Sequence, residues 1–127
     1  MAINPYLVLK ANGSDVAGEP RSTSVGGTDV SAMIECLAYS AGCHLPREHG
    51  SAQGTGRRQF SPVRFTKRWD KASPLIQQAL SQNQQIDAEF YFFRPNPETG
   101  EVEQFYGVVL EGGRCVGQTM EVDDVLA

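Results

Sequence analysis

The sequence predicts a mainly β domain, a small barrel or sandwich against which a single helix packs. Six short segments rich in aliphatic, β-branched and aromatic residues are separated by turns rich in glycine, proline and asparagine, a pattern typical of strands. Only one segment, at about 74–82, has apolar residues at helical spacing. A chain of 127 residues is the size of one domain, and no internal repeat divides residues 1–127.

The first half of the chain is expected to hold two strands and two long loops. The first strand is YLVLK, at 6–10, and a loop rich in glycine, serine and acidic residues follows over 11–28. In the second strand, at 31–40, the apolar residues fall on both faces, which is typical of a strand covered on both sides. One face would meet the core and the other a neighbouring molecule. Residues 42–59 contain four glycines and a proline, and they predict an extended loop too long to be a mere connector.

The third strand is expected at 60–69, and its residues alternate between the two faces of a half-buried strand. One face would be solvated, and the other would point into the core. The expected solvated residues are Arg64, Thr66 and Arg68, and the expected core residues are Val63, Phe65 and Trp69.

The helix is expected to begin at Ser73, whose side chain can cap the free amides, with Pro74 at the first helical position. An apolar stripe follows over two to three turns. Asn83 is expected to end the helix because asparagine tolerates the left-handed conformation.

The last third is expected to form antiparallel strands. Strands at 86–94 and 103–111 flank a turn at 95–100. Gly112-Gly113 is expected to be a two-residue hairpin loop that leads into a last strand at 114–118.

Composition narrows the function. The net charge of -4 and the pI near 5.1 argue against a nucleic-acid-binding protein. The sequence has no apolar run of 18 residues that would insert into a membrane, and its first residues do not resemble a cleaved signal peptide. We therefore expect synthesis in the cytoplasm. The three cysteines are an odd number without framework spacing and are expected to be free thiols, with Cys36 and Cys115 in the core.

The sequence gives only weak support to four possible chemical sites. Cys36, Cys43, His44 and His49 do not have the spacing of a common zinc site, so loop histidines without a ligand role are the favoured interpretation. Cys43 beside a histidine lacks a third, orienting group for nucleophilic catalysis. The glycine-rich segment 50–56 lacks the Lys-Ser/Thr ending of a phosphate-binding loop. The acid–base pairs Asp70/Lys71 and Asp87/Glu89 are explained by a helix start and by a solvated strand face.

The order of these features resembles the haemolysin-coregulated protein (Hcp) family, the tube protein of bacterial type VI secretion. The resemblance is carried by IECLAYSAG, by a glycine-rich loop ending in GTGRRQF, by FTKRWDKASPLIQQAL and by IDAEFYFFR. It runs from about Tyr6 to Met120. The central segment 65–80 resembles the family's signature most strongly.

The resemblance implies two β-sheets closed into a small barrel with one flanking helix, at about 74–82. It also implies homohexameric rings that stack into a hollow tube, with the spike and sheath proteins of the system and effector proteins in the lumen as partners. Assembly would be cytoplasmic, followed by secretion through the same system without a cleaved signal peptide. No enzymatic activity, catalytic residue, metal or cofactor is expected, nor binding to nucleic acid or insertion into a membrane.

Family members continue past the segment that resembles 117–127 into a loop and one or two further strands. The chain is therefore expected to be a shortened or divergent member. A missing strand would leave an unpaired sheet edge, which invites pairing with another chain.

The residues expected at subunit and ring contacts come from three parts of the chain. They are the two-sided strand, the loop 42–59, whose charges would fix the contact between stacked rings, and the outer face of strand 86–94. The residues are Ile34, Leu37, Tyr39, Arg47, Glu48, Arg57, Arg58, Asp87, Glu89 and Tyr91. Ser40 is the residue expected to face the lumen and its cargo.

A second hypothesis is a monomeric β-barrel binding module whose long loops grip a peptide or a glycan. It predicts a concave site lined by exposed aromatic residues, and the sequence offers Tyr91, Phe93 and Tyr106 for it.

Overall fold

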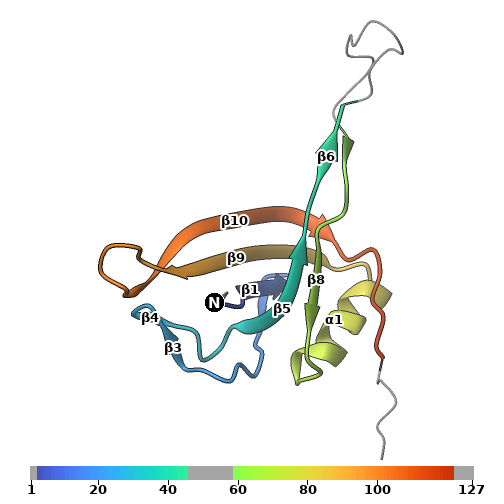
Figure 1. Ribbon diagram of the computed structural model, residues 1–127. Helices are drawn as coiled ribbons and strands as arrows, with labels where there is room; N and C mark the ends of the chain where they lie inside the picture. The colour runs from blue at the N-terminus through green and yellow to red at the C-terminus, as the bar shows by residue number, and fades with distance from the viewer. Residues whose placement is uncertain (1–2, 46–58, 122–127) are drawn as a thin grey trace, which may run out of the picture.

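The computed structural model describes residues 3–45 and 59–121, which are mainly β with a single helix (Figure 1). The fold class expected from the sequence is confirmed. In chain order the elements are β1 (Tyr6–Ala11), β2 (Ser14–Val16), β3 (Ser24–Val25), β4 (Thr28–Asp29), β5 (Ile34–Ser40), β6 (Cys43–His44), β7 (Gln59–Phe60), β8 (Arg64–Lys67), α1 (Ala72–Ser81), β9 (Gln85–Pro95) and β10 (Val102–Arg114). None of the described helices has the length and apolar character to cross a membrane.

Six strands form one antiparallel sheet in the order β10-β9-β1-β5-β8, with β2 paired to β1. The short pairs β3–β4 and β6–β7 stand apart from it. Within the described residues no ladder joins β10 to β8, so the sheet is open and does not close into the expected barrel.

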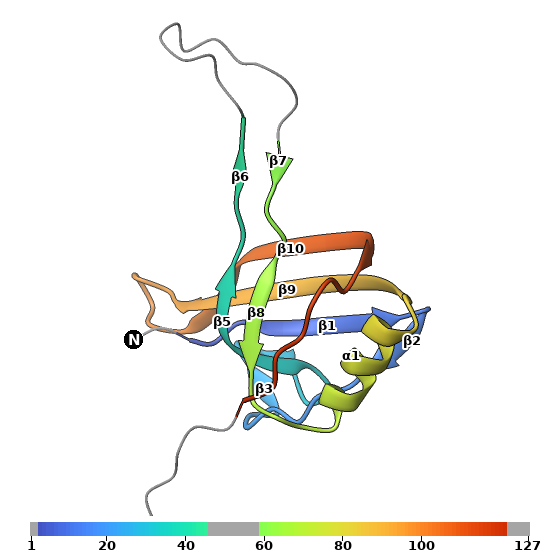
Figure 2. The ribbon, with the colours of Figure 1, turned by 90° about the vertical axis from the view of Figure 1, so that its right-hand side faces the viewer.

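The sheet bends into two crossed layers, with β5 as the link between them. Its first residues pair with β1, Ile34 opposite Leu7, and its later residues pair with β8. Figure 2 shows β1, β9 and β10 side by side in one layer, with β5 and β8 crossing in front of them and α1 beside β8. We call β1, β9 and β10 the first layer, and β5, β8 and α1 the second.

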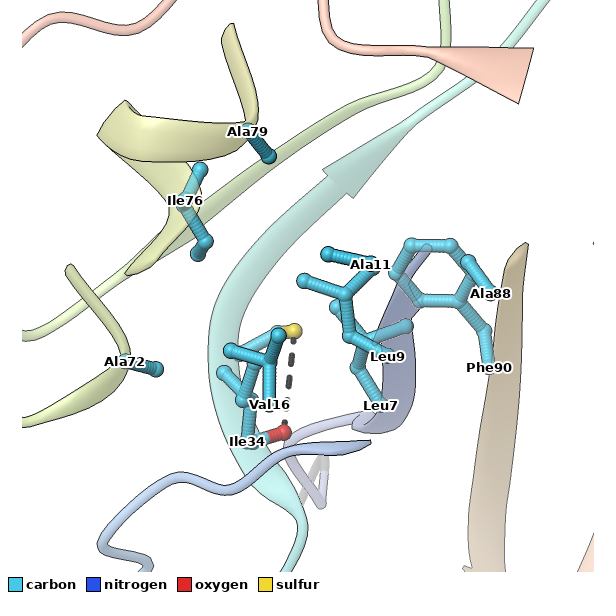
Figure 3. Close-up of a cluster of buried hydrophobic side chains, with 11 residues drawn as sticks. Leu7, Leu9, Ala11, Val16, Ile34, Ala72, Ile76, Ala79, Ala88 and Phe90 are labelled. Carbon is cyan, nitrogen blue, oxygen red and sulfur yellow. Dashed lines mark hydrogen bonds between the residues drawn. The ribbon is translucent and has the colours of Figure 1, made fainter. Parts of the chain in front are cut away.

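The main core lies between these layers (Figure 3). It consists of alternate residues of β1 and β9, the start of β5 and one face of α1, and each large apolar side chain buried there contributes about 1.5–3 kcal/mol. Cys36 is fully buried in this core, as expected, and burial raises the pKa of its thiol to about 12. The buried members are Leu7, Leu9, Ala11, Val16, Ile34, Cys36, Ala72, Ile76, Ala79, Ala88 and Phe90.

The segment 11–28 is not the plain loop that its composition suggested. It contains β2 and β3 and the first residue of β4, and two hairpin turns shape it. Asn12-Gly13 has φ values of 52° and 80°, and Gly26-Gly27 has φ values of 56° and 81°. Two successive positive φ angles suit tight two-residue hairpins.

The β3–β4 hairpin covers a second, smaller core on the far side of the first layer. Tyr6, Val30 and Phe93 are buried there, and the Tyr6 and Phe93 rings meet edge to face with centroids 5.9 Å apart. Phe93, expected on an exposed face, is therefore buried.

The helix begins earlier than expected, at Ala72, and Ser73 does not cap it. The Ser73 hydroxyl instead accepts hydrogen bonds from Lys67 Nζ at 3.0 Å and from the Asp70 amide at 3.2 Å. Asp70 instead binds a free amide at the helix start, since its Oδ1 accepts a hydrogen bond from the Ala72 amide at 2.9 Å. Asn83, at φ 51°, ends the helix in the left-handed conformation that the sequence predicted.

Gly112-Gly113 is not a hairpin loop, because both glycines lie inside the single long strand β10. The register with β9 shifts between Leu110 and Gly113, so this is a β-bulge. The Gly112 amide, at φ 68°, donates to Asp87 Oδ1 at 2.9 Å and so fixes the bulge against β9. No strand follows it in the part of the chain that is described, so the expected strand at 114–118 is wrong.

The expected strand 60–69 is divided into β7 and β8, with Pro62 between them. β7 pairs with β6, with Cys43 opposite Phe60, so both ends of the expected loop 42–59 are paired. Figure 1 shows this β6–β7 arm extending away from the two layers.

A buried carboxylate, Glu35, ties three segments together at the start of β5. It is 9% exposed and accepts hydrogen bonds from the Arg21 amide at 3.0 Å, from Arg21 Nη2 at 2.8 Å and from Asn4 Nδ2 at 2.9 Å. Arg68 Nη1 lies 3.8 Å from Glu35 Oε2. The bonds from Arg21 are the main reason that the pKa of Glu35 is lowered to about 2.

We expect Glu35→Gln to lower the free energy of unfolding by about 1–3 kcal/mol at pH 7, because it removes a charged hydrogen-bond acceptor. A lowered pKa in the folded state stabilises the fold above the ordinary pKa of 4.5, and this stabilisation is lost as the pH falls towards about 2. Urea unfolding at pH values from 7 to 2 measures both effects, and the variant should depend less on pH. Glu98→Gln, in an exposed turn, is the control. Equal stability and an equal pH slope in wild type and Glu35→Gln would contradict the role of this carboxylate.

Candidate assembly surfaces

The residues of β5 expected at contacts, Ile34, Leu37 and Tyr39, and the expected lumen residue Ser40 have different environments. Ile34 is fully buried in the core of the single subunit, so its side chain is not available to a neighbour. Tyr39 is half-buried, with its ring centroid 4.9 Å from that of Phe90. Leu37, at the irregularity in the β5–β8 register, is 42% exposed, and Ser40 is exposed. Of these four residues, only Leu37 and Ser40 therefore have exposed side chains.

The β5–β8 pair has an inner and an outer face. Tyr39 pairs with Phe65, and both pack against the main core. The neighbouring pairs are Ala38 with Thr66 and Ser40 with Arg64, and all four residues are exposed. Because side chains alternate along a strand, these four residues define one surface, which we call the β5–β8 outer face. Arg68, the first residue after β8, lies at the end of this face, 3.8 Å from Glu35.

The sequence correctly placed Arg64, Thr66 and Arg68 on the exposed side of this strand. It wrongly placed Trp69 in the core, since this side chain is 58% exposed. The strand ends at Lys67, so strand alternation no longer holds at Trp69.

A second outer face belongs to the first layer, on the side turned away from α1. Ala88 and Phe90 point into the core, so Asp87, Glu89 and Tyr91 point the other way. The Tyr91 hydroxyl donates to Glu89 Oε2 at 2.6 Å, and this bond is the main cause that raises the pKa of Tyr91. The sequence therefore gave the correct side for all three expected residues.

An open hollow of about 640 Å³ lies on this face, over the start of β9 and the end of β10. Val8 and Val109 flank Glu89 in the register, and Lys10 lies opposite Asp87. With Glu111, which also lines the hollow, three carboxylates surround one lysine, so the hollow is acidic.

The expected contact residues Arg47, Glu48, Arg57 and Arg58 lie outside the described residues. His49 and the glycine-rich segment 50–56, considered above for metal and phosphate binding, lie there too.

The described part of the chain contains no group of three or more His, Cys, Asp or Glu side chains placed to hold a metal ion. Cys36 is buried, whereas Cys43 and His44 are exposed on β6.

The aromatic residues named for a peptide or glycan site do not form an exposed concave site, and two of them, Tyr91 and Phe93, belong to the small core. Phe93 is buried in the small core, Tyr91 is half-buried beside Glu89, and Tyr106 is 59% exposed and packs against Phe92. None of the three lines the open hollow. The hypothesis of a binding module therefore receives no support from the described residues.

These features place the chain in the class of mainly β domains with two crossed layers, one flanking helix and a projecting hairpin arm. Residues 9–122 match the family model described as type VI secretion system effector, Hcp. The match covers nearly the whole chain, and the chain belongs to the Hcp family. The resemblance noted in the sequence is thereby confirmed.

Known proteins agree with this assignment. The chain is 40% identical over 117 residues to the major exported protein of Pseudomonas aeruginosa, over 87% of this chain and 67% of the relative. The Hcp1 protein of the E. coli EAEC 042 pathovar, solved as a mutant, is similar with a TM-score of 0.74 and 28% identity, over 87% of this chain and 72% of that one. The secreted protein Hcp3 from Pseudomonas aeruginosa, at 21% identity and a TM-score of 0.66 over 87% and 73% of the two chains, shares the fold.

The expected contact residues omitted several charged side chains that the structure places on the two outer faces. Lys10 and Glu111 join the acidic hollow, and Arg64 and Arg68 lie on the β5–β8 outer face. Strand alternation could have identified Lys10 from the sequence. The side of Glu111 could not be predicted, because the bulge at Gly112 shifts the register beside it.

Proposed function

We propose that this chain is a tube subunit of a type VI secretion system. In this proposal six copies close into a ring, rings stack into a hollow conduit, and the conduit carries effector proteins past the sheath and spike of the system. The subunit is then exported by the same system. The observation that carries the proposal is the match of residues 9–122 to the Hcp family model. The relative named as a major exported protein supports export.

The strand order supports association with further chains. Within the described residues, the outer edges of β8 and β10 are paired with no strand of the sheet. Unpaired edges expose backbone donors and acceptors that another chain can use. Two different edges on one subunit suit head-to-tail contacts, which close into a ring when the rotation per subunit permits it.

Within this proposal, Leu37 and the face around Asp87, Glu89 and Tyr91 lie at contacts with other copies, and Ser40 faces the lumen. Leu37 is the large apolar residue of β5 that is most exposed, at 42%. Burying such a side chain in a contact would contribute about 1 kcal/mol or more per copy.

We expect Leu37→Asp to weaken ring formation at least about tenfold, because it would bury an unpaired charge at the contact. Analytical ultracentrifugation over a range of concentrations measures this. Val116→Asp is the control, since Val116 is 76% exposed and is not among the expected contact residues. Equal assembly of wild type and Leu37→Asp would remove this residue from the contact.

A second variant tests the loop 42–59. We expect charge reversal in Arg57→Glu/Arg58→Glu to leave single rings intact and to shorten or abolish stacked tubes, because in this proposal these charges lie at the contact between rings. Electron micrographs give the tube lengths, and light scattering gives the ring mass. Lys71→Glu/Arg114→Glu has the same change in net charge and is the control. Unchanged tube lengths in the loop variant would contradict the role of the two arginines.

A further inference from the structure

The β5–β8 outer face carries positive charge although the whole chain is acidic, with a net charge of -4. Arg64 is exposed, and Arg68 has a side chain that is 52% exposed. Arg64 begins β8, and Arg68 is the first residue after β8 ends at Lys67.

The nearby acidic residues do not neutralise this face. Glu35 is buried and is held mainly by Arg21, whose side chain is itself 63% exposed, and Arg68 Nη1 lies 3.8 Å from the same carboxylate, so Arg64 is the less neutralised of the two arginines. Asp70 is also mostly buried, and its Oδ1 lies 2.6 Å from Lys67 Nζ. Each of these two carboxylates thus already has its own basic partner. Among the described residues of β5 and β8, the outward side chains are therefore basic or uncharged.

The side chains around Arg64 are small. Arg64 stands opposite Ser40, and the next outward pair is Ala38 with Thr66. A protein surface can therefore approach the guanidinium of Arg64 closely. The charges of the subunit are also segregated, since the open hollow of the first layer is acidic and lies on the side turned away from the second layer.

We propose that the β5–β8 outer face binds acidic protein surfaces, with Arg64 as the principal contact and Arg68 as the second. The proposal rests on the proposed function, in which Ser40 on this face lines the lumen. Its partner is then a cargo protein that presents clustered aspartate or glutamate side chains. An arginine guanidinium can bind a carboxylate with two parallel hydrogen bonds, which makes such contacts specific as well as attractive.

Assembly would strengthen this interaction. In a closed ring each copy would place its Arg64 at the same height, so that weak contacts act together on one acidic cargo. Net negative charge over the whole chain would repel polyanions that do not reach this face. The net charge of -4 favours a protein partner over nucleic acid, although Trp69, next to Arg68, is 58% exposed and is a side chain on which a base could stack.

The test uses the full chain and two probes, a fluorescent 20-residue polyglutamate peptide and a 20-nucleotide single-stranded DNA. Fluorescence anisotropy measures binding, and light scattering on the same samples gives the mass of the protein. We expect the peptide to bind wild type, with an affinity that falls as salt is raised. Arg64→Glu should weaken peptide binding at least about tenfold, and Ser40→Glu should weaken it in the same direction without removing an arginine.

Arg114→Glu is the matched control, since Arg114 is exposed at the end of β10 and the change in net charge is the same. Equal peptide binding by wild type and Arg64→Glu, or an equal loss in Arg114→Glu, would overturn the proposal. Tighter binding of the DNA than of the peptide would overturn the assignment to proteins. If the protein forms rings, the tube function stands whatever the result of the binding measurement. If the protein is a monomer that binds the peptide through Arg64, the tube function is contradicted and the assignment of an acidic partner is not.

Discussion

The strand β5 is the constraint on which the rest of the structure depends, because among the described strands it alone pairs both with β1 of the first layer and with β8 of the second. At its start Ile34 and Cys36 are fully buried against β1, and Glu35 between them holds Asn4 and Arg21. The strand then changes register at Leu37 and continues against β8. Because antiparallel pairing fixes both directions, this bend decides how the two layers cross and where the core lies.

The alternation of side chains along each strand determines which residues lie on the surface of the subunit. Burial of Leu7, Leu9 and Phe90 in the main core turns the residues between them outward, and so brings Lys10 and Glu89 together in the acidic hollow. Burial of Tyr39 and Phe65 likewise turns Ser40 and Arg64 outward as neighbours. A one-residue slip in either ladder would exchange core and surface, so the packing of the core and the charge of each face are coupled.

Much of the fold could be predicted from local patterns, and the failures have physical causes. The strands at β1 and β9 and the helix end at Asn83 followed from alternation and from a left-handed residue. The prediction that Ser73 caps the helix was wrong because Lys67, brought near by the β8–α1 turn, binds the Ser73 hydroxyl. The prediction of a hairpin loop at Gly112-Gly113 was wrong because a glycine pair suits a bulge as well as a hairpin. Only the pairing of the strand with β9 decides between the two. For the residues expected at contacts, the sequence predicted the exposed side of β9, on which Asp87, Glu89 and Tyr91 lie, but not the burial of Ile34, which packs in the core of the single subunit.

The central claim is that this chain closes into rings, and its mass in solution tests this most directly. Multi-angle light scattering on the purified chain, with negative-stain images of the same sample, measures the mass and the shape of the particles. We expect six times the 13.9 kDa mass of the chain and annular particles, some of them stacked end to end. A single species of 13.9 kDa at every concentration, with no rings in the images, would contradict the claim.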